Sequence, residues 1–247
     1  MIVDASGEQR LPLPAGTQGI TWSPDASQIA YVVYVPTHGY TISSLDLATG
    51  ESTMQVRGIG VAGGVRWSPD GNRIAYQAPM GLVSEIFVYE LDSAVLRPEQ
   101  VTQGLGAFDP EWTPDGERLI VSALTETQTY EIYELDPATG EVSQITNSSD
   151  IYKRLPRFSP DGGTIAYTGS IIVPTVSRIA ASLHSFGVFL MNSDGSNERA
   201  LTADPRLNPG QGVDPFLDAI LIGWCRPGPW LDDTWTLGDP QASPVIQ

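Results

Sequence analysis

The stretch FDPEWTPDGERLIVSA, residues 108–123, decides the fold because it is one of four similar segments in the chain. The other copies are GITWSPDASQIAYVV (19–33), GVRWSPDGNRIAYQA (64–78) and LPRFSPDGGTIAYTG (155–169). Their shared aromatic residues, Trp22, Trp67, Trp112 and Phe158, are 45, 45 and 46 residues apart. A regular internal period of this length indicates a molecule built from copies of one supersecondary unit.

Each unit reads as four antiparallel strands. The first ends at the motif aromatic, and a β-rich triplet such as Ile74-Ala75-Tyr76 follows seven residues later as the second. An alternating apolar run such as SEIFVYELDS gives the third strand, and a short run such as EQVTQG gives the fourth. Four strands in about 45 residues are typical of one propeller blade. The sequence therefore predicts an all-β fold, a β-propeller of four-stranded antiparallel blades.

The phrase SPDG specifies a tight turn between the first two strands of each unit. Proline presets φ, aspartate bonds nearby backbone amides, and glycine accepts positive φ. The first copy has Ala26 in place of glycine, which predicts a strained or reshaped turn. The aromatics are expected to pack between blades. The residues assigned to this structural motif are Trp22, Pro24, Asp25, Trp67, Pro69, Asp70, Gly71, Trp112, Pro114, Asp115, Gly116, Phe158, Pro160, Asp161 and Gly162.

We expect one domain over residues 1–247, with blades at 14–57, 58–104, 105–148 and 149–204. Residues 205–247 are expected to form a degraded or partial fifth blade, in which either Leu217 or Trp224 takes the aromatic position. DASGEQRLPL (4–13) resembles SDGSNERALT (193–202), so residues 1–13 are a candidate closing strand for that blade. The alternative is a truncated propeller that lacks a blade. A closed ring should be monomeric, whereas an open one exposes strand edges.

Charge and composition exclude several partners. The chain has 13 basic and 29 acidic residues, a net charge of −16 that repels nucleic acid and anionic lipid. Cys225 is alone and forms no internal disulfide. The most apolar segment contains Pro174, Arg178 and His184, which argues against membrane insertion. The N-terminus has no secretory signal, so we expect a periplasmic or extracellular location if a leader is missing, and a cytoplasmic one otherwise.

The residue patterns predict no catalytic residue, metal or cofactor. GxSxG is absent and the two histidines, His38 and His184, are far apart in sequence, so no triad can be argued. Neither these histidines nor Asp232-Asp233 gives metal-ligand spacing. The GxGxxG at 58–63 runs into a strand instead of a helix, so it is interpreted as a connection between blades. Asn147-Ser-Ser is a glycosylation sequon or simply a turn.

W-S-P-D-G followed by an I-A-Y strand at this period resembles the TolB-type propeller repeat, a relative of WD-type repeats, from residue 1 to about 213. TolB-type propellers usually have six blades. The resemblance implies a non-catalytic module that binds a protein or peptide in the bacterial envelope. The alternative it implies is a substrate-gating propeller of a prolyl-oligopeptidase-type peptidase, or another propeller hydrolase or lyase.

In that topology one face collects the loops between second and third strands and between successive blades. The candidate partner-binding residues on this face are His38, Asp109, Tyr152, Lys153, Arg154 and Asp214. Lys153 is the only lysine in the chain, and beside a tyrosine and an arginine it suits a carboxylate-bearing partner. The alternative is an ordinary solvated loop charge.

These assignments give two further expectations. Changing Lys153 and Arg154 together to glutamate is expected to weaken partner capture without changing the melting temperature. The fourth repeat holds about ten additional residues between its second and third strands. Part of this insertion, TVSRIAASLHSF (175–186), is expected to form a short helix because its apolar residues recur at helical spacing.

Overall fold

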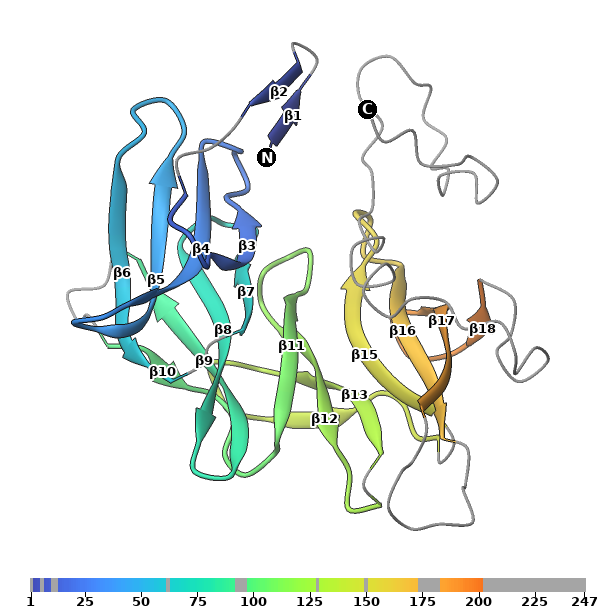
Figure 1. Ribbon diagram of the computed structural model, residues 1–247. Coiled ribbons are helices and arrows are strands. Elements are labelled where there is room, and N and C mark those ends of the chain that lie inside the picture. Colours follow the sequence, from blue (N-terminus) through green and yellow to red (C-terminus); the bar gives the residue numbers. More distant parts are fainter. Residues whose placement is uncertain are drawn as a thin grey trace. The chain divides into compact units, whose positions relative to one another are not determined.

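The computed structural model describes residues 2–4, 7–9, 13–60, 63–91, 97–127, 129–148, 151–172 and 183–201. The chain divides into two compact units, Met1–Pro156 and Arg157–Gln247, each of which is described by itself. The described residues form four four-stranded antiparallel sheets and one two-stranded sheet, and contain no helix (Figure 1). The prediction of an all-β propeller with four-stranded antiparallel blades is confirmed.

Each large sheet is a meander in chain order. The first contains β3 (Gln18–Trp22), β4 (Gln28–Val35), β5 (Gly39–Asp46) and β6 (Ser52–Ile59). The second contains β7 (Gly63–Trp67), β8 (Arg73–Met80), β9 (Val83–Glu90) and β10 (Glu99–Gln100). The third contains β11 (Ala107–Trp112), β12 (Leu119–Leu124), β13 (Tyr130–Leu135) and β14 (Val142–Gln144). The fourth contains β15 (Ile151–Phe158), β16 (Thr164–Ile172), β17 (Leu183–Asn192) and β18 (Arg199–Ala200).

One blade boundary and the end of the expected helix differ from the sequence prediction. The division expected between residues 57 and 58 falls inside β6. Within the described part of the chain, β1 (Ile2–Asp4) and β2 (Gly7–Gln9) pair with each other. The blade that residues 1–13 are expected to close lies outside the described residues, so that expectation stays a prediction. Residues 183–186, expected at the end of a helix, are strand because they pair with β16. The remainder of that helix and the expected fifth blade, with Leu217, Trp224 and Cys225, lie outside the described residues.

The SPDG turns have the expected internal hydrogen bonds. In the second sheet the Asp70 carboxylate accepts from the Ser68 hydroxyl and from the Asn72 amide at 3.0 Å. Equivalent amide bonds reach Asp25, Asp115 and Asp161 at 3.0, 2.9 and 3.0 Å. The pKa of each of these three carboxyls lies below the usual aspartate value, because a serine or threonine hydroxyl and then a backbone amide donate to the ionised form.

Ala26 keeps the turn at the cost of backbone strain. Its φ is 57°, in the same left-handed region as Gly71, Gly116 and Gly162 at 78°, 74° and 75°. An L-residue in that region is disfavoured by about 1–2 kcal/mol because Cβ approaches the backbone. Of the two expected outcomes, strain and reshaping, the structure shows strain.

Ala26→Gly is therefore expected to raise the free energy of unfolding by about 0.5–1 kcal/mol, since strain relief outweighs the added flexibility of the unfolded chain. Urea denaturation measures the change. Gly71→Ala is the matched control and should lower stability by about 1 kcal/mol, because it introduces the same strain into the second turn. Unchanged or reduced stability of Ala26→Gly would contradict the strain assignment.

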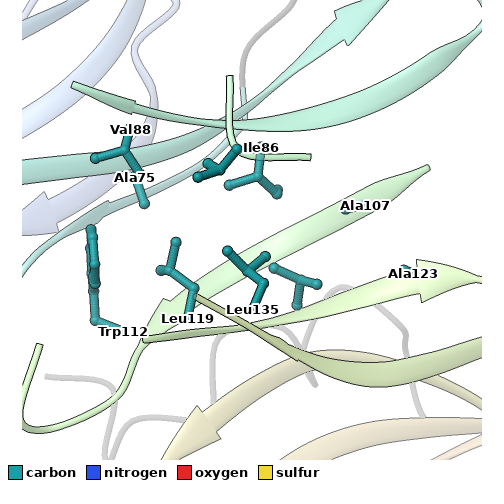
Figure 2. Close-up of a cluster of buried hydrophobic side chains, with 10 residues drawn as sticks. Ala75, Ile86, Val88, Ala107, Trp112, Leu119, Ala123 and Leu135 are labelled. Atoms are coloured by element: carbon teal, nitrogen blue, oxygen red, sulfur yellow. The ribbon is translucent and has the colours of Figure 1, made fainter. Parts of the chain in front are cut away.

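The apolar core lies between consecutive sheets of the first unit. Between the first and second sheets, Val32 and Ile42 pack in one buried cluster with Ile74 and Tyr76. Figure 2 shows the next cluster, where Ala75, Ile86 and Val88 from the second sheet face side chains of the third sheet that include Trp112, Leu119 and Leu135. The buried triplets of the second strands therefore supply both faces of the packing, as the repeat predicts.

The four motif aromatics are not equally buried. Trp112 is 4% exposed, donates from Nε1 to the Arg66 carbonyl at 3.3 Å, and lies under the Arg73 guanidinium at 4.6 Å. Trp67 and Phe158 are partly buried. Trp22 is 45% exposed, so the expectation that it is a core residue is wrong for the described part of the chain. The reason is that Trp112 packs on the preceding sheet, and no large sheet precedes β3 among the described residues.

Candidate functional site

The first strand of every large sheet bends at the same position. Three residues before each motif aromatic, Gly19, Gly64, Asp109 and Leu155 all have positive φ, between 53° and 56°. The first three lie where the register to the second strand shifts. Such bulges re-aim side chains and concentrate near functional sites. Leu155 adopts this conformation with a side chain that disfavours it, a local strain of the kind found at functional sites, whereas aspartate at position 109 tolerates it better.

Asp109 connects three strands. Its amide donates to Gln77 Oε1 on β8 at 2.7 Å. Its Oδ2 accepts from Arg154 Nε at 2.6 Å and from the Leu155 amide at 3.3 Å, both on β15. Asp109 itself lies in β11 and is 6% exposed, so the prediction that it is a surface loop residue is wrong. Its buried carboxylate instead fixes the position of Arg154.

Two aromatic rings contact the Arg154 guanidinium. Its Cζ is 5.0 Å from the centre of the Phe108 ring and 5.1 Å from that of Tyr130. Tyr130 also makes edge contacts with Phe108 and Tyr152, at 5.7 and 5.6 Å between ring centres. The Arg154 side chain is 38% exposed and all three rings are partly buried. We call Phe108, Asp109, Tyr130, Tyr152 and Arg154 the arginine cluster; all five belong to the first unit.

Lys153 is not part of this surface. Its side chain is fully buried in β15, with Nζ 3.3 Å from Glu131 Oε2 and in contact with the Ser148 hydroxyl. Glu131 is equally buried and also accepts from Thr146 Oγ1 and the Ser148 amide at 2.5 and 2.7 Å. Both interpretations of Lys153, as a partner contact and as a solvated loop charge, are wrong. The reason is the buried carboxylate, which requires a cation beside it.

The two remaining candidates, His38 and Asp214, are not placed in the arginine cluster. His38 follows β4, is partly buried, and its Nδ1 is 2.7 Å from Thr37 Oγ1. In the portion of the chain that the structure describes, no hydrogen bond or ring contact joins it to the arginine cluster. Asp214 falls outside that portion. Sequence reasoning missed Phe108, although repeat alignment could have found it: Phe108 and Arg154 each stand four residues before a motif aromatic.

A second ion pair lies beside the cluster. Arg66 on β7 donates from Nε to Glu111 on β11 at 2.8 Å. Burial raises the pKa of Glu111 above the usual range for glutamate, and the charge of Arg66 opposes that rise. Because Arg66 and Glu111 each directly precede a motif aromatic, the pair joins equivalent positions of two neighbouring first strands.

Metal sites, dinucleotide sites and membrane spans each need particular residues or elements. The described residues contain no group of three or more His, Cys, Asp or Glu side chains placed to hold a metal. The GxGxxG segment leads from β6 to β7 and therefore joins two strands, whereas a dinucleotide site needs a helix after the glycines. None of the described segments is a helix long and apolar enough to cross a membrane.

Comparison with known proteins agrees with this architecture. The sequence profile of the TolB beta propeller domain matches residues 1–203. The chain belongs to the TolB beta propeller domain family. A search of curated proteins gave no match for this TolB-type propeller.

Solved structures show the same fold. TolB from Acinetobacter baumannii is 25% identical with a TM-score of 0.61, over 75% of this chain and 43% of that one. A putative TolB from Agrobacterium tumefaciens is 22% identical with a TM-score of 0.60, over 74% and 64%. An oligogalacturonate lyase from Vibrio parahaemolyticus is 15% identical with a TM-score of 0.54, over 76% and 54%. This TolB-type propeller thus spans less than two thirds of each of these structures.

Proposed function

We propose that the chain is a non-catalytic propeller that binds a protein or peptide through the arginine cluster. The observation that carries the proposal is the half-exposed Arg154, held by Asp109 against the rings of Phe108 and Tyr130. Arginine and aromatic side chains are enriched at interfaces and contribute most of the binding energy there. The family resemblance favours the bacterial envelope as the setting.

The cluster is suited to binding because its parts are already ordered. Ordering a long side chain at an interface costs about 0.5–1.5 kcal/mol of conformational free energy. The contacts of Arg154 with Asp109 and two rings already order its side chain in the unbound protein, so binding a partner loses less of this free energy. The groups of the cluster suit ligand binding: three aromatic rings, a guanidinium, and a carboxylate that already accepts from two donors. Similarity to the lyase, at 15% identity, concerns the fold alone.

Arg154→Gln is expected to weaken binding of partner peptides at least about tenfold, because a charged hydrogen-bond donor at an interface centre contributes about 2 kcal/mol or more. Peptides would be selected on the chain from a displayed random library and their affinities measured by fluorescence anisotropy. Arg118→Gln is the matched control, since Arg118 is 49% exposed and paired with Glu134 at 2.8 Å. Failure to select any peptide, or equal losses in both variants, would contradict the proposal.

A further inference from the structure

We infer that Arg154 binds a carboxylate of its peptide ligand beside an apolar or aromatic ligand side chain, and that Asp109 is a positioning residue whose charge also competes for the same guanidinium. The inference rests on the proposed function and names the ligand chemistry of its site. It concerns a peptide C-terminus or an acidic side chain, two sources of the same chemical group.

The geometry of the guanidinium carries the first part. Arginine presents five N–H donors in a planar fork that matches a carboxylate. Arg154 uses Nε for Asp109 at 2.6 Å, and 38% of its side chain is accessible. A ligand carboxylate that reaches this accessible part meets the positive charge of Arg154 in a chain whose net charge of −16 otherwise repels anions. Selectivity for a carboxylate must then come from direct contact with Arg154.

The rings carry the second requirement of the ligand. Phe108 and Tyr130 both lie within about 5 Å of the guanidinium carbon, and Tyr152 extends this surface from Tyr130. All three residues are partly buried, so part of each remains accessible to a ligand. A ligand whose carboxylate reaches Arg154 places its neighbouring side chain against these residues. An apolar or aromatic side chain gains most from that contact.

Asp109 has two opposing effects on such a ligand. Its hydrogen bond to Arg154 Nε holds the guanidinium in place, while its negative charge reduces the attraction for a second carboxylate. These effects can be separated experimentally because Asp109 has a φ of 55°, a conformation that asparagine also tolerates. Asp109→Asn retains an oxygen that can accept from Nε and removes the charge.

The test uses three probes: N-acetyl-phenylalanine, its C-terminal amide, and N-acetyl-aspartyl-phenylalanine amide, titrated against the full chain by ligand-observed NMR. We expect at least one carboxylate probe to bind about tenfold or more tightly than the simple amide. Arg154→Gln should remove that preference and Arg118→Gln should keep it. Asp109→Asn should strengthen carboxylate binding severalfold without strengthening binding of the amide. The tighter of the two carboxylate probes identifies the source.

Several results would overturn the inference. The inference is wrong if the simple amide binds as tightly as both acids, or if neither acid binds. It is also wrong if the Asp109→Asn variant loses the carboxylate preference as Arg154→Gln does. If selected peptides still depend on Arg154 in those cases, the proposed function survives and only the ligand chemistry is wrong. If the acid probe binds but no peptide can be selected, the proposed function fails and the carboxylate site remains.

Discussion

Lys153→Met is expected to lower the free energy of unfolding by about 3–5 kcal/mol, although it replaces a polar side chain with an apolar one of similar length. The carboxylate of Glu131 and the ammonium of Lys153 are both 0% exposed and lie 3.3 Å apart. Removing the cation leaves a buried carboxylate whose other donors among the described residues, Thr146 Oγ1 and the amide and hydroxyl of Ser148, are neutral. A buried charge without a counter-ion is among the costliest single defects in a protein.

Chemical denaturation of three variants tests this. Lys153→Met combined with Glu131→Gln should recover most of the loss, because no buried charge is then left uncompensated. Arg118→Ala is the control for an exposed ion pair and should cost no more than about 1 kcal/mol. A Lys153→Met protein as stable as the wild type would show that this pair is not buried in solution. The same reasoning withdraws the expectation that charge reversal at Lys153 leaves the melting temperature unchanged.

Trp112→Ala is expected to cost about 3–5 kcal/mol, whereas Trp22→Ala should cost about 1 kcal/mol or less. Trp112 is 4% exposed and supports both a hydrogen bond to the Arg66 carbonyl and the stacked Arg73 guanidinium. Trp22 holds the same position in its repeat and is 45% exposed. The two substitutions remove the same atoms, so the difference measures how much of each ring is covered by a neighbouring sheet.

Urea denaturation of both variants, at several protein concentrations, gives the comparison. A small effect at Trp22 is the result expected from the described residues. An effect at Trp22 as large as at Trp112 would contradict it and would show that the ring is covered in solution. Dependence of that effect on concentration would attribute the cover to a second molecule, and independence to another part of the same chain.

The features that sequence predicted well are local or repeated. Turn chemistry acts within five residues, and the Asp70 bonds to Ser68 and Asn72 follow from it directly. The period of about 45 residues predicted the blade, because four strands with short turns require about that length. The boundaries between blades were predicted less accurately: β6 continues beyond the expected end of its repeat.

Burial of individual site residues could not be predicted in the same way, because it depends on neighbours distant in sequence. Lys153 is buried in an ion pair with Glu131, which is 22 residues away, and no other repeat has a lysine at that place. The equivalent position in the third repeat, five residues before Trp112, holds the apolar residue Ala107, and this was the available sequence signal; the structure shows Ala107 fully buried. Asp109 and Arg154 were both candidates, but their pairing became visible only in the structure.

The contacts between consecutive first strands have a consequence for the order of the repeats. Val65 Cγ2 lies 3.7 Å from the place a Cβ would take at Gly19, Arg66 pairs with Glu111, and Asp109 pairs with Arg154. Each junction therefore has different chemistry, although the repeats resemble one another in sequence. A strand that associated with a non-neighbouring repeat during folding would bring unlike partners together and leave ionised groups unmatched. We therefore expect that a duplicated or transposed repeat would not be interchangeable with the one it replaces, because its partners at these junctions would differ.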